Sequence, residues 1–400
     1  MNGMHAIYRG YAALMLMTVL WLLWSGPSSQ ASAAKPVELI QLTFIVHVDD
    51  TADMSSWLTI NSPTLTREIK HARWQTYTAQ PVLYPDLEVE LSQGVHHATY
   101  RLSEDGRLWN AANQQLLELP VKTANTMKAL AQTVRGQYYG RKLPWDEVRR
   151  LIPNKSIFTV TDLQTGLRFR VQRRAGSDHA DVQPVTKADT RIMKQIFNGE
   201  WSWNRRAILV RTDMDWIAAS MNGMPHGGDG IPDNDFSGHF CIHFYLSTTH
   251  KSDTPDLAHQ LMVHKASGEL QSYLDDADPL LIARSYIEAL NHRDRAIVHQ
   301  ITLGMQEDQF NNALTRMDAL DSIRDTTNRR RNHSATSGGK SNEWNNQLTA
   351  EVQLPVAYRM KGGAQHNTMF HFTFNRPSTS APWRLVRIDT DSSRNVNNPQ

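Results

Sequence analysis

Residues 238–244, GHFCIHF, decide the fold of the central part of the chain. Apolar and polar side chains alternate through this stretch with a period of two, which is typical of a β-strand whose two faces meet different surroundings. Its phenylalanines and isoleucine share one face and predict contact with a hydrophobic core. His239, Cys241 and His243 share the opposite face. The stretch therefore predicts a strand that presents one thiol between two imidazoles.

The sequence on either side of this strand predicts a β-rich domain over residues 155–270. Two alternating runs joined by a Gln-Thr-Gly turn, residues 158–174, predict a hairpin. Thr186 followed by Asp189 predicts the start of a helix that ends at Phe197. Two further strands, a loop rich in Gly, Pro, Asp and Asn, and a second helix are expected at residues 207–212, 216–222, 223–238 and 255–266.

The flanking segments complete a multidomain α+β fold. Alternating apolar runs such as residues 37–47 predict a β-rich N-terminal domain, and Thr123 is the expected cap of the helix that follows it. Residues 280–290 have helical spacing, and three strand-like runs after them predict a curved antiparallel sheet that forms a cone. The expected parts are a signal peptide at 1–34, the N-terminal domain at 35–120, a helical connector at 121–154, the candidate catalytic domain at 155–270 and a C-terminal α+β domain at 278–393.

The start of the chain predicts export. Arg9 precedes the apolar run 11–24, and small residues follow, including an Ala-Ser-Ala cleavage pattern at 31–33. The run is shorter than the roughly 20 residues that cross a bilayer, so we expect cleavage; an uncleaved membrane anchor is the alternative. The mature protein is therefore expected in the cell envelope or outside the cell, with no membrane span after cleavage.

The charge balance and the cysteine count exclude several classes of protein. The chain of 400 residues carries 42 Lys and Arg against 40 Asp and Glu, a balance that argues against a nucleic-acid partner. Its single cysteine rules out an internal disulfide, so ordinary hydrophobic cores must stabilise the fold. Three interpretations of Cys241 remain: a buried inert thiol, a reactive nucleophile, or half of an intermolecular disulfide.

The neighbours of Cys241 favour the nucleophile. Besides the two histidines on its own strand, His226 and His250 lie within residues 220–250. An imidazole beside a thiol can lower the pKa of the thiol or act as its general base. The alternative is a half-exposed polar strand face without activity.

This block resembles the catalytic motif of the L,D-transpeptidases of bacterial cell walls. That family has a His-Gly dipeptide, a variable loop and then Ser-His-Gly-Cys; this chain has Pro-His-Gly at residues 225–227 and Ser-Gly-His-Phe-Cys-Ile-His at residues 237–243. The resemblance implies that Cys241 is the nucleophile and His226 the general base. It also implies an oxyanion hole made by backbone N–H groups near Cys241.

Three positions depart from the family's pattern. Phe240 stands where the family has Gly, Gly238 is inserted between Ser and His, and His243 replaces an Arg or Asn. The implied reaction is acyl transfer on peptidoglycan or its stem peptides, with either an amine or water as the acceptor. This mechanism needs no cofactor.

Two broader resemblances concern the rest of the chain. Residues 176–186, 198–210 and 219–227, together with GHFCIHF, resemble blocks of uncharacterised exported proteins of Gram-positive bacteria, which implies an envelope role. The C-terminal part, ending in W-x-L-V-x-I-D at residues 383–389, resembles the nuclear-transport-factor-two-like superfamily. Modules of that superfamily serve as ligand pockets, dimerisation units or spacers.

A zinc-dependent peptidoglycan peptidase is the second hypothesis. His179 and Asp181 form a His-x-Asp pair like that of carboxypeptidases of the D-Ala-D-Ala type. His226, His239 or His243 would complete a site of three protein ligands with an open position for water. No helical H-E-x-x-H pattern accompanies them.

A module that binds the cell wall without catalysis is the third hypothesis. Trp203 would stack on sugar rings, and Arg205 and Arg206 would pair with carboxylates of a glycopeptide; a tryptophan packed in the core is the alternative. The aspartates of residues 227–239 offer oxygen ligands for calcium. The same composition makes turns, and we prefer that interpretation.

Overall fold

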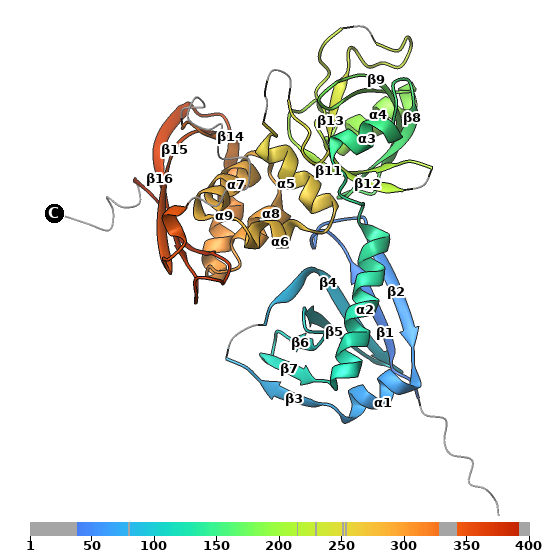
Figure 1. Cartoon of the computed structure of the whole chain (residues 1–400), viewed down its shortest axis with the longest axis vertical. Helices are drawn as coiled ribbons and strands as arrows, with labels where there is room; N and C mark the ends of the chain where they lie inside the picture. Colours follow the sequence, from blue (N-terminus) through green and yellow to red (C-terminus); the bar gives the residue numbers. More distant parts are fainter. Residues whose placement is uncertain are drawn as a thin grey trace, which may run out of the picture. The chain divides into compact units, whose positions relative to one another are not determined.

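The computed structural model describes residues 38–78, 81–213, 215–228, 230–249, 252, 254–327 and 342–391 (Figure 1). Within them the chain has the predicted α+β class, with three antiparallel sheets, the middle one closed into a barrel. The expected signal segment, residues 1–34, lies outside the described residues. None of the helices in the described part is long and apolar enough to cross a membrane.

The first sheet contains seven strands. They are β1 (Gln41–Val46), β2 (Ser56–Asn61), β3 (Arg73–Thr76), β4 (Leu83–Gln93), β5 (His96–Ser103), β6 (Leu108–Asn110) and β7 (Gln115–Glu118). Their order in the sheet is β2-β1-β4-β5-β6-β7-β3. Leu42, Phe44 and Val46 of β1 are fully buried and alternate with more exposed residues, because successive side chains of a strand point to opposite faces.

Three helices belong to this half of the chain: α1 (Pro63–His71), α2 (Val121–Tyr138) and α3 (Trp145–Leu151). Helix α2 packs against β1 and β2 through a stripe that includes Met127, Ala131 and Val134 (Figure 1). The expectation that Thr123 caps α2 is wrong. Pro120 occupies the cap position without a side-chain hydrogen bond, and Thr123 is buried within the first turn.

The central sheet is the barrel. Its strands are β8 (Ile157–Asp162), β9 (Arg168–Ala175), β10 (Ala180–Pro184), β11 (Arg206–Arg211), β12 (Trp216–Met221) and β13 (Phe240–His243). They close in the order β10-β13-β12-β11-β8-β9. The hairpin of β8 and β9 confirms the sequence prediction. Strand β10 was not predicted, because its ADVQP sequence is short and is buried at every position, so that no alternation marks it.

Helix α4 (Lys187–Ile196) covers part of the barrel and packs on β9 and β10. The predicted start of this helix is confirmed. The Thr186 hydroxyl accepts a hydrogen bond from the backbone N–H of Asp189, and the Asp189 carboxylate accepts one from the backbone N–H of Thr186. This reciprocal pair satisfies two N–H groups that a helix start leaves free.

The two faces of β13 meet different surroundings, as its alternation predicts. Phe240 and Ile242 are fully buried and belong to one apolar cluster that is drawn from all six barrel strands. His239, Cys241 and His243 therefore lie on the opposite face, outside the apolar interior of the barrel. The core of the barrel thus fixes the direction in which the thiol points.

The C-terminal part combines helices with a four-stranded sheet of order β14-β15-β16-β17. Its elements are α5 (Leu257–Ala266), α6 (Leu270–Asp275), α7 (Pro279–His292), α8 (Arg295–Ile301), α9 (Glu307–Ala319), β14 (Leu320–Asp325), η2 (Asn342–Trp344), β15 (Thr349–Met360), β16 (Gln365–Asn375) and β17 (Arg384–Thr390). Helix α7 packs on β14 and β15. The sequence predicted one strand too few, because β14 buries Leu320 and Ile323 three residues apart across a register shift.

The first prediction concerns the barrel core. Phe240 is fully buried, with Phe169 and Phe236 at ring-centroid distances of 6.2 and 5.8 Å. Phe240→Ala should lower the free energy of unfolding by about 3–5 kcal/mol, because it leaves a cavity that the barrel cannot close. Ile157→Ala is the control, since Ile157 is 54% exposed on β8. Denaturant titration measures both variants, and similar losses would contradict this assignment of the core.

Candidate functional site

Strand pairing places a carboxylate beside the thiol. Strand β13 lies between β10 and β12, and Asp181 of β10 stands directly opposite Cys241. Directly opposed residues of two antiparallel strands point to the same face. The Asp181 Oδ1 atom therefore comes within 3.8 Å of the Cys241 sulfur.

A backbone bridge brings His226 to the same place. The backbone N–H of His226 donates to His239 O at 2.9 Å, and that of His239 donates to His226 O at 2.7 Å. The two ends of the loop, His226 and His239, are thus held side by side. Gly227 and Gly238 flank the bridge with φ values of 77° and 86°, a conformation that glycine adopts without strain.

The His226 ring is oriented for proton transfer with the thiol. Its Nε2 atom lies 3.3 Å from the Cys241 sulfur, and its Nδ1 atom lies 2.8 Å from Met224 O. A carbonyl oxygen only accepts, so Nδ1 carries the hydrogen. In the neutral ring, Nε2 then directs its lone pair at the sulfur. This is the arrangement of a nucleophile and base in which a third group orients the base.

Asp181 links the thiol to two further imidazoles. Its Oδ1 atom lies 3.2 Å from His179 Nε2 and 3.6 Å from His239 Nε2. Both Asp181 and His179 are buried, whereas the side chain of His239 retains 20% of its exposure. The residues of the zinc hypothesis thus surround the same sulfur that the transpeptidase resemblance singles out.

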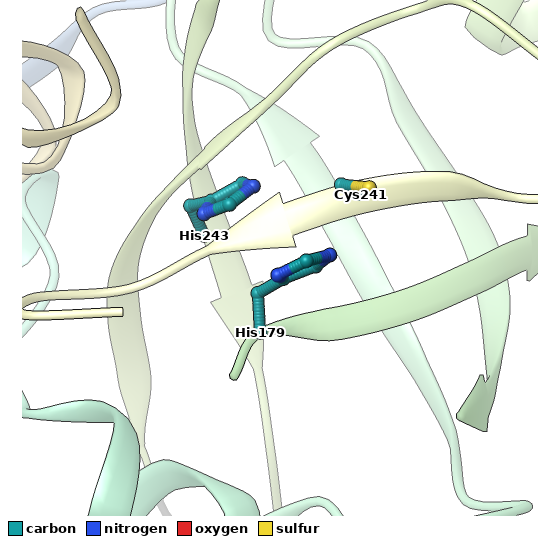
Figure 2. A group of neighbouring side chains, drawn as sticks. All are labelled: His179, Cys241 and His243. Carbon is teal, nitrogen blue, oxygen red and sulfur yellow. The ribbon is translucent and has the colours of Figure 1, made fainter. Parts of the chain in front are cut away.

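Stacked imidazoles continue the cluster on its buried side. The rings of His179 and His243 stack with centroids 4.4 Å apart (Figure 2). Those of His243 and His259 stack with centroids 3.7 Å apart. His259 comes from α5, and the hydroxyl of Ser220 lies 2.8 Å from its Nδ1 atom. Burial, with His243 as the next cause, holds the pKa of His259 well below its usual value. The His259 ring is therefore neutral.

Cys241 is buried, and the electrostatics of the cluster around it favour the protonated thiol. Burial and then the Asp181 carboxylate raise the pKa of Cys241 to about 12, against the opposing effects of Arg205 and of a hydrogen bond from Asn222. At neutral pH the sulfur is therefore a thiol, and its proton must leave during any attack or metal binding. No pattern in the sequence marked Asn222, which is buried directly after β12.

Two groups of residues in the described part have the spacing of metal ligands. One contains His226, His239 and Cys241, and is partly accessible; the other contains His179, His243 and Cys241, and is buried. Figure 2 shows the second group: Cys241 and His243 lie on one strand, and the ring of His179 lies beside them. Both groups share the same sulfur.

Of the three residues predicted to bind substrate, two lie beside the cluster and one does not. Trp203 is 52% exposed, and its ring lies 5.2 Å from that of His226. Arg205 affects the thiol through its charge and donates to Trp203 O. Arg206 is committed to a two-point ion pair with Asp162, at 2.9 and 2.6 Å. Trp203 and Arg205 thus border the cluster, and Arg206 supports the barrel.

The loop between His226 and His239 is held by its own turn chemistry. Asp233 and Asp235 have φ values of 61° and 58°, which aspartate tolerates better than most residues. Between them, the buried Asn234 side chain donates to Pro184 O and accepts from the N–H of Phe236. Asp229 and His250 lie outside the described residues.

The fold and the site define an α+β protein whose barrel carries a thiol–histidine–carboxylate cluster outside its apolar interior. No protein-family model, curated protein or solved structure matches the chain.

The second prediction tests the backbone bridge. A Cβ atom on Gly227 would lie 2.2 Å from His239 Cε1, whereas one on Gly228 would have no atom within 4 Å. Gly227→Ala should cost about 1–3 kcal/mol through strain and displacement, and it should push the His239 ring away from the bridge. Gly228→Ala, the matched control, should stay within about 0.5 kcal/mol. Unfolding titrations measure the cost, and equal effects of the two substitutions would refute the bridge.

The third prediction concerns the protonation of the thiol. With a pKa of about 12, the alkylation rate of Cys241 by iodoacetamide should still rise above pH 9, whereas a free cysteine levels off around a pKa of about 8.5. Because folding raises the pKa of this thiol, the free energy of unfolding should decrease as pH rises from about 8.5, the pKa of a free cysteine, toward 12. Mass spectrometry follows the modification, with denatured protein as the control. A plateau near pH 8.5 in the native protein would contradict this environment.

Proposed function

We propose that the chain is an exported enzyme of the cell envelope that transfers acyl groups of peptides through Cys241. One observation carries the proposal: the sulfur lies 3.3 Å from His226 Nε2, and the Nδ1 atom of that ring is held by Met224 O. A thiol and a correctly oriented base within this distance are the minimum that thiol catalysis needs. The resemblance to L,D-transpeptidases assigns the same two residues to these roles.

The proposed reaction begins with the protonated thiol. His226 Nε2 takes the thiol proton while the sulfur attacks the amide carbonyl, and the carbonyl electrons move to the oxygen. As the tetrahedral intermediate collapses, the C–N bond breaks and the imidazolium returns the proton to the leaving amine. A thioester remains on Cys241, and an amine or water then displaces it. Because the pKa of the thiol is raised to about 12, the base must act during the attack itself.

The departure at Phe240 places no bulky side chain beside the buried sulfur. Phe240 replaces a glycine next to the nucleophile, but its ring is buried in the barrel core. It therefore points away from Cys241, because neighbouring residues of a strand alternate. The buried amide of Asn222 is a hydrogen-bond donor to the sulfur, and in the proposed reaction it would also stabilise the developing oxyanion.

Peptidoglycan stem peptides are the substrate that the surroundings favour. Trp203 offers an exposed ring beside His226, and aromatic faces stack on sugars. Arg205 supplies positive charge to the pocket, which suits the carboxylates of such peptides. The expected export of the chain would bring it to the same compartment as this polymer.

The fourth prediction tests catalysis with a purified tetrapeptide muropeptide. Intact-mass analysis should detect an acyl adduct on the wild-type chain and none on Cys241→Ala. His226→Gln should slow adduct formation by about 10²–10⁴-fold, the usual contribution of a general base. His96→Ala, at an exposed position on β5, is the control and should react normally.

Two results would reject the proposal. One is turnover that persists in Cys241→Ala, because the sulfur would then not be the nucleophile. The other is a wild-type chain that forms no adduct and releases no product with tetrapeptide or pentapeptide muropeptides. If the chain forms the adduct, the product masses with and without an added amine will show whether the acyl acceptor is the amine or water.

A further inference from the structure

The geometry points to a metal site of four protein ligands that uses the same sulfur: we propose that His226, His239, Cys241 and Asp181 bind one zinc ion. Three of the ligand-to-ligand distances are given by the structure. The Cys241 sulfur lies 3.3 Å from His226 Nε2 and 3.8 Å from Asp181 Oδ1, and that oxygen lies 3.6 Å from His239 Nε2.

These separations are those of a tetrahedral zinc site. With Zn–N near 2.0–2.1 Å and Zn–S near 2.3 Å, neighbouring ligand atoms lie about 3.3–3.6 Å apart. His226, His239 and Cys241 also offer ligand atoms that are all within 4.8 Å of one another. Binding one ion therefore requires movements of side chains rather than a rearrangement of the strands.

The hydrogen bonds around the site prepare it for a cation. The Nδ1–H group of His226 donates to Met224 O, so Nε2 is left with a lone pair toward the sulfur. Fixing the tautomer of a ligating histidine by a carbonyl oxygen is the usual arrangement in zinc proteins. The side chain of His179, 3.2 Å from the Asp181 oxygen, supports the carboxylate from the buried side.

The choice between the two candidate groups follows from access and ligand number. The group with His179 and His243 is buried, which denies an ion a short path from solvent. The group with His226 and His239 is half-buried and reaches the surface. Thiolate and imidazole ligands together favour zinc over magnesium or calcium.

The number of ligands indicates what the ion would do. Catalytic zinc keeps an open position for water, whereas sites with four protein ligands are closed. Four protein ligands thus argue against the zinc-peptidase hypothesis for this cluster. A bound ion would instead hold Cys241 as a coordinated thiolate, with its proton released to solvent. Zinc would therefore inhibit the nucleophile reversibly by coordinating its sulfur. We call this role the lock, and it rests on the proposed function.

The fifth prediction measures the metal and the thiol separately. The full chain, stripped with a chelator and titrated with Co²⁺ as a spectroscopic probe, should bind one equivalent. A thiolate-to-cobalt charge-transfer band should appear and should vanish in Cys241→Ala. His226→Ala and His239→Ala should each weaken binding at least about tenfold, whereas the exposed-site control His96→Ala should not. Zinc should slow alkylation of Cys241 at least about tenfold, and chelation should restore it.

Three outcomes would overturn the site: no binding, binding without the charge-transfer band, or binding that survives loss of both His226 and His239 but not His243→Ala. The last result would place the ion in the buried group. X-ray absorption on the zinc-loaded wild-type chain gives the ligand set without any variant, so a misfolded mutant does not leave the question open. If the stripped protein forms the acyl adduct but binds no metal, the metal site and its role as a lock fail and the proposed function stands. If it binds metal but forms no adduct, the proposed function and the lock fail and the metal site stands.

Discussion

The site depends on the antiparallel pairing of β10 with β13, which sets Asp181 directly opposite Cys241. The pairing is possible only because six strands close into a barrel, whose apolar interior takes Phe240 and Ile242 and turns the thiol outward. A register shift of one residue would reverse the faces, burying the polar side chains in the core. The energy that fixes the thiol beside the carboxylate is thus the hydrophobic packing on the other face of the same strand.

A carboxylate 3.8 Å from a buried sulfur constrains the chemistry of the pocket. Two negative charges so close are costly, and the pKa of Cys241, raised to about 12, expresses that cost. The pocket can resolve it by keeping the proton on sulfur until His226 removes it, or by placing a cation between the two ligands. The proposed acyl transfer and the proposed metal binding would each avoid two adjacent negative charges, and they would compete for the same sulfur atom.

Local patterns in the sequence predicted what depends on local structure. The alternation in GHFCIHF gave the two faces of β13, and the Thr186–Asp189 spacing gave the start of α4. The sequence could place His179 and Asp181 near Cys241 only as one of several ligand combinations, because β10 shows no alternation and its pairing joins residues sixty positions apart. No local pattern marked Asn222. Its hydrogen bond to the sulfur arises only because the end of β12 lies beside β13.

The glycines of the loop explain how the cluster tolerates a phenylalanine where the transpeptidase motif has glycine. A Cβ atom on Gly238 would lie 2.3 Å from His226 O, so the close approach of backbone to backbone occurs at this position, three residues before Cys241. Phe240, which precedes Cys241, therefore does not need to be a glycine, and its side chain packs in the barrel core. Gly238 thus keeps His226 against the strand, and Phe240 anchors the strand that carries the thiol.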